Sequence, residues 1–202
     1  MIPVVLQAEP KLPVFDFDGQ VRQRGHAWLK AQGMALDAAP PRAATLPNYW
    51  SKSNKPLWDA YSGVCAWLAI FFEWPTGASS TDHFIAKSNN AGAAYEWDNY
   101  RLSCLGANRN KNKYDDLLDP IGLAQDTFLL NLLNGRVRPH PKLDALAKAA
   151  VVKTINRVKL NSPEVRAMRA RHYSDYLRHQ HPPTLKFYSP FVWYEASRQG
   201  LL

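Results

Sequence analysis

Hydrophobic residues recur at helical spacing in the first half of the chain. Over residues 21–33 they predict a short helix, whose C-terminus Gly33 can cap. Over residues 57–72 they predict a buried helix, which we expect to give way to a strand near residues 69–73. Between this stretch and the next, Pro75 and Gly77 interrupt the pattern.

The second half of the chain has a pattern typical of helices. An apolar stretch at residues 127–133 ends at the turn pair Asn134-Gly135. Residues 143–158 have the apolar spacing of an amphipathic helix. Ser162-Pro163-Glu164 is a strong helix start, because Ser favours the cap position and Pro suits the first turn. We expect that helix to run to about residue 180.

The composition is that of an ordinary folded domain. The chain has 202 residues, of which 46% are hydrophobic and 21% charged, so it can bury a sizeable core in one domain. Its longest apolar run, Val64 to Phe72, is about half as long as a membrane span. No secretory signal is visible at the N-terminus, and two cysteines are too few for a disulfide framework. We therefore expect a cytoplasmic protein without a membrane partner.

The positive charge is concentrated towards the C-terminus. Residues 1–139 contain 14 Lys and Arg against 13 Asp and Glu, whereas residues 140–202 contain 11 against 4. A basic region of this kind is typical of nucleic-acid-binding proteins, although a solvated, solubilising face would have the same composition. Arg166, Arg169 and Arg171 lie on the polar face of the last predicted helix and are candidates for contacts with a phosphate backbone.

These patterns divide the chain into three consecutive segments. Residues 1–48 are Pro-rich and irregular, apart from the short helix. Residues 49–139 form the expected core, which includes a candidate motif at residues 81–113. Residues 140–202 form a basic helical region that packs on this core. We expect the three segments to make one compact α+β domain that is mostly helical.

The candidate motif brings together an acid, an imidazole and two amides at defined spacing. Asp82 and His83 are adjacent, Asn99 follows His83 by sixteen residues, and Asn108 follows Asn99 by nine. Lys111 comes three residues after Asn108. Each of these residues alone is as common in a turn, on a surface or at a helix cap. Only their coincidence at this spacing indicates a site.

Together these residues resemble the HNH endonuclease family, whose catalytic element is the ββα-metal motif. Asp82-His83 matches the end of its first strand, Asn99-x-x-Leu102 the lead into its second strand, and Asn108-x-x-Lys111 the start of its helix. Many members have His at the position of Asn108, and Asn is a known variant there. The flanking residues resemble, more weakly, a bacterial group of HNH proteins associated with phage defence.

The resemblance implies a divalent-metal-dependent endonuclease that hydrolyses phosphodiester bonds in DNA. An imidazole that titrates near pH 6.5 can accept a proton from the attacking water, and the family gives this role to the position of His83. The family's metal ligands match Asp82 and Asn108, whose oxygen donors favour Mg²⁺ or Mn²⁺. The residue matching Asn99 orients the histidine by holding its Nδ1–H, which leaves Nε2 to face the water.

The resemblance also implies what surrounds the reaction. Arg109, Lys111 and Lys113 are expected near the substrate phosphates as counter-charges. One such motif cuts one strand, so a monomer is expected to nick DNA and to leave a 3′ hydroxyl and a 5′ phosphate. The wider resemblance suggests an antiviral defence effector that works beside an ATPase or a sensor protein.

Many HNH proteins also hold a structural zinc with two Cys-x-x-Cys pairs. Cys65 and Cys104 stand where one cysteine of each pair would be, and Leu68 and Ala107 occupy the partner positions. We therefore expect no structural zinc and two buried, inert cysteines.

Two other functions stay open. The chain could keep this fold for nucleic-acid binding or assembly without turnover, or it could be a toxin that cleaves RNA. Trp97 and Tyr100 flank Asn99 and are expected in the core of the motif, with stacking on bases as the alternative.

Overall fold

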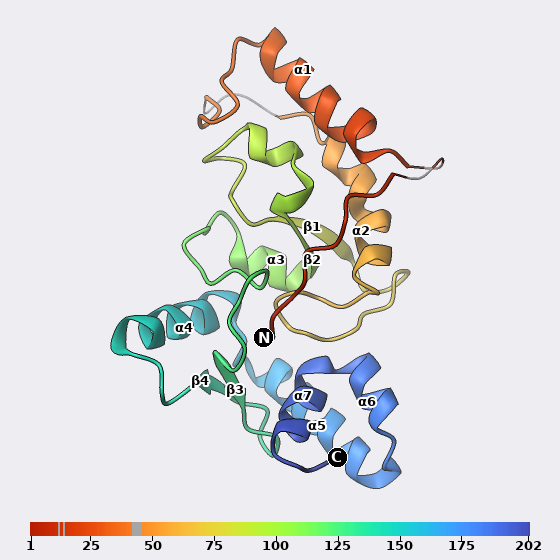
Figure 1. Ribbon diagram of the computed structural model, residues 1–202, viewed down its shortest axis with the longest axis vertical. Coiled ribbons are helices and arrows are strands. Elements are labelled where there is room, and N and C mark those ends of the chain that lie inside the picture. Colours follow the sequence, from red (N-terminus) through yellow and green to blue (C-terminus); the bar gives the residue numbers. More distant parts are fainter. Residues whose placement is uncertain (12, 14, 42–45) are drawn as a thin grey trace. The chain divides into compact units, whose positions relative to one another are not determined.

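The structure is a computed structural model that describes residues 1–11, 13, 15–41 and 46–202 (Figure 1). The chain forms two compact units: unit 1 contains residues 1–5, 64–73 and 117–202, and unit 2 contains residues 6–63 and 74–116. Each unit combines helices with a two-stranded antiparallel sheet, which confirms the predicted α+β fold. The boundaries expected at residues 48 and 139 fall inside these units. Residues 42–45 of the Pro-rich segment lie outside the described residues.

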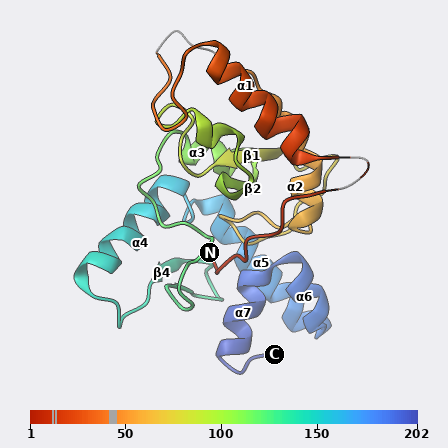
Figure 2. The same ribbon diagram turned by 45° about the horizontal axis from the view of Figure 1, so that its top comes forward.

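Unit 2 is built around a β-hairpin. Strand β1 (Ser79–His83) pairs with β2 (Tyr100–Cys104), and His83 lies opposite Tyr100. Helix α3 (Leu105–Lys111) follows β2 directly, and α2 (Asn54–Ala60) lies on the other side of the hairpin in both views (Figures 1 and 2). The remaining elements of the unit are η1 (Asp18–Arg22), α1 (Gln23–Ala31), η2 (Tyr49–Ser53), η3 (Gly92–Tyr95) and η4 (Trp97–Asn99).

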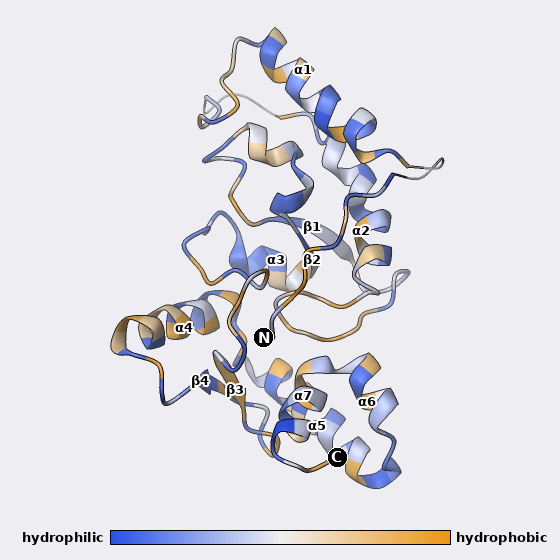
Figure 3. Cartoon of the chain, viewed as in Figure 1, coloured by the Kyte–Doolittle hydropathy of each residue, from blue (hydrophilic) through white to orange (hydrophobic). Residues whose placement is uncertain are grey.

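Aromatic rings fill the centre of unit 2. The ring of Phe17 packs edge-on against Trp97 at 5.3 Å and against Tyr100 at 5.6 Å, measured between centroids. All three residues are buried, so the core role expected for Trp97 and Tyr100 is confirmed. Helix α1 is largely hydrophilic (Figure 3) and covers this core with Gly25, which a larger residue could not replace because an added Cβ would lie 2.1 Å from the Tyr95 ring.

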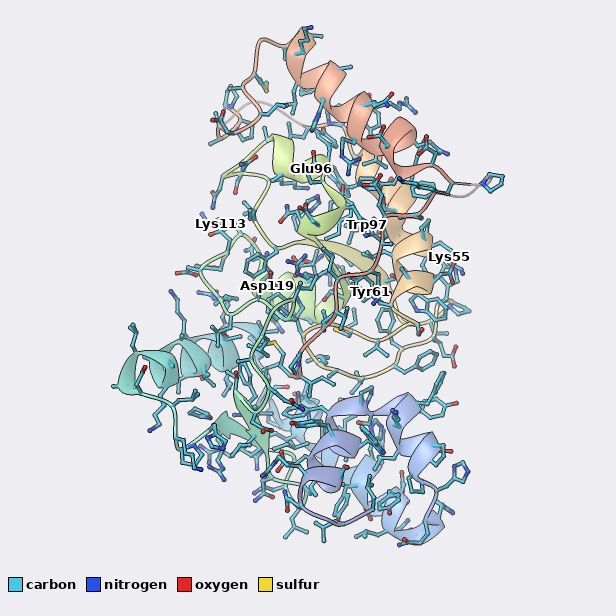
Figure 4. The ribbon with its side chains drawn as sticks, viewed as in Figure 1. Lys55, Tyr61, Glu96, Trp97, Lys113 and Asp119 are labelled. Carbon is cyan, nitrogen blue, oxygen red and sulfur yellow. The ribbon has the colours of Figure 1, made fainter. Side chains whose placement is uncertain are left out.

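One arginine joins three segments of unit 2. The guanidinium of Arg22 contacts the carboxylates of Glu9, Asp18 and Glu96, with 2.7 Å from Nε to Glu96 Oε2. Glu96 is labelled in Figure 4. These carboxylates raise the pKa of Arg22, which therefore stays charged. The contact fixes α1 against the segment that leads into β2.

The helix predicted over residues 57–72 forms only at its start, since α2 covers residues 57–60 of that range. The strand expected near residues 69–73 is a single bridge between Phe71 and Val64. Helix α2 ends at Ala60, because Ser62 and Gly63 take left-handed conformations with φ of 51° and 68°. The chain then turns back on itself, and the Cys65 N–H donates to the Ile70 carbonyl at 2.9 Å. The apolar residues of this loop pack in unit 1 instead. Their spacing therefore indicated a buried segment and not a helix.

Unit 1 contains a second hairpin and four helices among its described elements. Its elements are β3 (Phe128–Leu130), β4 (Val137–Pro139), α4 (Ala145–Val158), α5 (Pro163–His179), α6 (Pro182–Tyr188) and α7 (Pro190–Arg198). Helices α4 and α5 confirm the predictions for residues 143–158 and 163–180. The apolar stretch at 127–133 is the exception, since its centre forms a strand in a stretch expected to be helical.

Side chains hold the second hairpin in unit 1. The Asn161 side chain accepts from the Val137 N–H at 2.7 Å and donates to the Val137 carbonyl at 2.8 Å. Gly135, in the turn before β4, has φ of 66°, and an added Cβ would lie 2.0 Å from the Arg166 carbonyl oxygen. Only glycine therefore fits this turn. In the described parts of the chain, no helix is both long and apolar enough to cross a membrane.

Candidate active site

A cavity of about 700 Å³ opens in unit 2 where β1 ends. Asp82, His83 and Asn108 all line it, and Trp50 and Lys87 form part of its wall. The sequence-predicted general base and both predicted metal ligands therefore share one cavity. Asn99 does not line the cavity, and it can affect His83 only through other residues.

The strand geometry explains how these side chains reach the cavity. Successive residues of a strand point to opposite faces of a sheet. Ser80 and Asp82 face α3, where they contact Asn108 and Lys111. His83 faces the aromatic side, where its ring packs edge-on against Trp50 at 5.1 Å. The cavity lies at the end of the strand, where both faces open into it.

One ring nitrogen of His83 is committed to the backbone. Nε2 lies 3.0 Å from the carbonyl oxygen of Ala94, which can only accept, so Nε2 carries the proton of the neutral ring. Nδ1 has no hydrogen-bond partner among the described residues and is the nitrogen that can accept a proton. The expectation that Nδ1 is held and Nε2 faces the water is therefore reversed.

His83 is neutral at physiological pH. Burial lowers its pKa to about 3, and the nearby ammonium groups of Lys87 and Lys111 act in the same direction, against the Ala94 hydrogen bond. A neutral imidazole is the form that a general base requires. Its low basicity means that proton transfer needs a water made more acidic than bulk water.

Asn99 positions His83 indirectly. Its side-chain oxygen accepts from the Ile85 N–H at 2.7 Å, and its Nδ2 donates to the carbonyls of Ile85 and Ala93 at 3.0 and 2.8 Å. The next carbonyl along the chain, that of Ala94, is the one that holds His83. Asn99 is thus a positioning residue, and the sequence expectation of direct contact with the histidine is corrected.

The carboxylate of Asp82 is buried with a cation beside it. Lys111 Nζ lies 3.2 Å from Asp82 Oδ1 and also donates to the carbonyls of His83 and Phe84. The Lys111 side chain is fully buried, so its expected role beside substrate phosphates is corrected. Lys111 instead compensates the charge of Asp82 and ties α3 to the end of β1.

Asn108 is placed to offer an oxygen to the cavity. Its Nδ2 donates to Ser80 Oγ at 2.5 Å, and this bond leaves Oδ1 as the remaining polar atom of the side chain. The motif predicted Asn108 at the start of the helix, but the residue lies in the middle of α3. Among the described residues, no cluster of three or more His, Cys, Asp or Glu could hold a metal.

The oxygens of Asp82 and Asn108 fit a hard divalent cation. Mg²⁺ is commonly bound through one or two protein oxygens and completes its shell with water and phosphate. Two such donors in one open cavity match that requirement. Asp82 and Asn108 are therefore the residues that would hold Mg²⁺ or Mn²⁺, with Lys111 occupying one side of the carboxylate.

The rim of the cavity is positively charged. Arg109 and Lys113 lie on the side of α3 and are exposed (Lys113 is labelled in Figure 4), and the exposed Lys87 lies on the opposite wall. Asp82, the one carboxylate in the lining, already has Lys111 beside it. The lining as a whole therefore favours an anionic ligand.

The candidates on the last predicted helix belong to unit 1. Arg171 is exposed on α5, whereas Arg166 is half-buried and its Nε donates to the Asn134 carbonyl at 3.2 Å. Arg169 is only 1% exposed and donates to the Leu160 carbonyl at 2.6 Å, so its assignment to a phosphate-contacting surface is wrong. Its position on the helix turns it towards Phe191, inside the unit.

The two cysteines lie in different units. Cys65 is buried in unit 1, as expected, whereas Cys104 at the end of β2 in unit 2 is half-buried. The expectation of two buried thiols is therefore half right.

No family model matches this chain, and no curated protein is significantly similar to it in sequence. The HNH resemblance stays a prediction that rests on the motif residues. What the structure adds is a hairpin followed directly by a helix, with His83, Asp82 and Asn108 lining one cavity.

Sequence reasoning missed two residues of the cavity wall. Trp50 comes from η2, more than thirty residues before the motif, and Lys87 from the loop after β1. Lys87 Nζ lies 4.2 Å from the centre of the Trp50 ring. The sequence spacing of Trp50 and Lys87 does not relate them to His83. The only signal in the sequence was that one of them is aromatic and the other basic.

Proposed function

We propose that this chain is a divalent-metal-dependent endonuclease that hydrolyses phosphodiester bonds in DNA. The observation that carries the proposal is that a neutral imidazole with one unprotonated nitrogen shares a cationic cavity with two oxygen donors. A base, a place for a cation and a rim for phosphates are the parts that phosphodiester hydrolysis needs.

In the proposed reaction, Nδ1 of His83 accepts a proton from the water that attacks phosphorus. The bond from phosphorus to the 3′ oxygen breaks, and the leaving oxygen takes a proton from solvent to give a 3′ hydroxyl and a 5′ phosphate. Asp82 and Asn108 would hold the divalent cation, which when bound would compensate charge at the scissile phosphate and lower the pKa of the attacking water. Ala94 keeps the His83 ring in the required tautomer, and Asn99 keeps that carbonyl in place.

The test is a supercoiled-plasmid assay in Mg²⁺ and then in Mn²⁺. Wild-type protein is expected to convert the plasmid to the open circle, because a single site nicks one strand. His83→Ala is expected to lose this activity. Equal activity in both proteins would exclude His83 as the base.

The competing proposal is a nucleic-acid-binding or assembly protein without turnover. The buried Lys111 beside Asp82 is the observation that favours it, because an ammonium already compensates the carboxylate proposed to bind the metal. Binding of Mn²⁺ by wild type but not by Asp82→Ala, followed by thermal shift, would favour the enzyme. An RNA-cleaving toxin is separated by comparing single-stranded RNA with plasmid DNA as substrate.

A cytoplasmic antiviral effector is the biological setting that we propose for this activity. An ATPase or sensor protein would then be its partner and would release the nuclease when triggered. Co-purification of such a partner, with stimulation of plasmid nicking, is the result that this setting requires.

A further inference from the structure

A row of aromatic side chains, two of them partly exposed, leads up to His83 in unit 2. Tyr49 and Trp50 are consecutive residues of η2 and are each half-buried. The Tyr95 ring lies beside both rings, with centroid distances of 6.1 Å to Tyr49 and 5.9 Å to Trp50. The Trp50 ring then reaches the His83 ring edge-on at 5.1 Å.

The backbone around η2 holds this row in place. The Pro47 carbonyl accepts from the Tyr49 N–H at 2.9 Å and from the Tyr95 hydroxyl at 3.0 Å. Gly25 of α1 lets the Tyr95 ring approach closely from the other side. The two rings of η2 are therefore presented on a rigid support, which lowers the entropy cost of stacking on them.

Each of these two rings carries a cation on its face. The Arg24 guanidinium lies 4.6 Å from the centre of the Tyr49 ring, and Lys87 Nζ lies 4.2 Å from the centre of the Trp50 ring. Both cationic side chains are exposed, so the contact with the aromatic ring holds each of them only weakly. Alternating exposed aromatic rings and cations are typical of surfaces that bind single-stranded nucleic acid.

We propose that Tyr49 and Trp50 form a stacking platform for unpaired bases of single-stranded DNA, which delivers the strand to His83. The proposal rests on the proposed function and names the substrate form for the same cavity. A base stacks on the Trp50 ring, Lys87 moves from that ring to a neighbouring phosphate, and the next phosphate enters the cavity. A paired duplex has no exposed base face to offer and gains little from the platform.

The chain offers a matched control for Trp50. Trp58 on α2 also belongs to unit 2 and also lies beside a lysine, with Lys55 Nζ 5.2 Å from its ring centre. It does not line the cavity. Trp50→Leu and Trp58→Leu thus remove the same ring and a similar cation contact at two places.

The experiment measures affinity for a labelled oligonucleotide in EDTA, so that no cleavage occurs. Trp50→Leu is expected to weaken binding of single-stranded DNA about 5- to 100-fold, the loss typical of one stacked base. Trp50→Tyr, which keeps a stacking ring, should stay within about threefold of wild type. Trp58→Leu should match wild type, and duplex of the same sequence should be affected far less by Trp50→Leu. Single-stranded RNA should lose the same factor as DNA, because stacking does not read the sugar.

Three results would overturn the platform. The first is wild-type affinity of Trp50→Leu for single-stranded DNA, and the second is an equal loss of affinity for single strand and duplex. Trp50→Tyr failing to restore binding, although it folds like wild type, would also overturn it. Cleavage of the same single-stranded oligonucleotide in Mg²⁺ by wild type but not by His83→Ala tests the nuclease separately. Cleavage without an effect of Trp50→Leu on binding would exclude only the platform, and an effect of Trp50→Leu on binding without cleavage would exclude only the nuclease.

Discussion

Lys111 Nζ lies 3.2 Å from Asp82 Oδ1, and both side chains are almost completely buried between β1 and α3. A buried carboxylate without a compensating charge is strongly unfavourable, so this pair matters most when one partner is removed. The same carboxylate is the proposed metal ligand. Under that proposal, Lys111 and a divalent cation would be alternative or joint partners of one carboxylate.

Lys111→Met is expected to destabilise the protein by about 3–5 kcal/mol, because it leaves Asp82 buried without this ammonium. Mg²⁺ or Mn²⁺ should recover more stability in the variant than in wild type, since the cation replaces the lost charge. Urea denaturation with and without metal measures both effects. Lys55→Met, which removes the exposed pair with Asp59, is the control and should cost no more than about 1 kcal/mol. An unchanged response to metal would mean that Asp82 does not bind it.

Asn99→Ala is expected to cost about 2–4 kcal/mol of stability, because three hydrogen bonds to the loop after β1 are lost. It should also free the Ala93–Ala94 segment, so that His83 no longer keeps one tautomer. The ¹⁵N chemical shifts of the His83 ring report the tautomer directly. Asn90→Ala removes one contact to the same turn, the bond from the Ala93 N–H, and should leave the tautomer unchanged. A single His83 tautomer in Asn99→Ala would refute the positioning role.

His83 is expected to make stability depend on pH in the absence of metal. Its pKa is about 3 in the folded chain, against about 6.5 when unfolded, so between these values the unfolded chain binds one more proton. Stability should therefore be complete above pH 6.5 and should fall as the pH drops towards 3, by up to about 1.4 kcal/mol per pH unit. The difference between wild type and His83→Gln in EDTA isolates this term. Parallel curves for the two proteins would show that the histidine is not buried as described.

The two arginines of α5 provide a paired test of nucleic-acid contact. Arg171→Ala should weaken DNA binding and lower the slope of log affinity against log salt concentration by about one, as for one lost phosphate contact. Arg169→Met should leave both quantities unchanged, because the Arg169 guanidinium is buried against the Leu160 carbonyl. Salt titrations of the two variants decide the matter. Equal slopes for Arg171→Ala and wild type would exclude α5 from the protein surface that binds DNA.

Local patterns predicted the parts of the fold that local interactions determine. Helix α5 begins with Pro163 after Ser162 at the cap position, as the sequence predicts, although the Ser162 side chain makes no capping hydrogen bond. Helix α4 follows the predicted amphipathic pattern and begins where Asp144 accepts from the Ala147 N–H at 2.7 Å. The helix predicted after α2 does not form, because two left-handed residues, Ser62 and Gly63, end α2. The stretch is nevertheless apolar because it is buried in unit 1. An apolar run tells where a segment is buried and not which backbone it takes.

The candidate site divides in the same way. Asp82, His83 and Asn108 could be brought together from the sequence, because one hairpin and one helix within thirty residues connect them. The orientation of His83 could not, since it depends on the Ala94 carbonyl in the short 3-10 helix η3, which the sequence pattern did not predict. Helical periodicity placed Arg169 on a polar face, but tertiary packing buries this one side chain, which donates to the Leu160 carbonyl and lies near the Phe191 ring.

The interleaving of the two units along the chain sets an order on their completion during synthesis. Every residue of unit 2 has been made once Asp116 leaves the ribosome, so the hairpin and its cavity can form then. The loop with Cys65 and Trp67 has been made as well, but the residues 117–202 that bury it have not. For that interval the newly made chain presents its most apolar segment to the cell, and a nascent-chain binding factor would find it there.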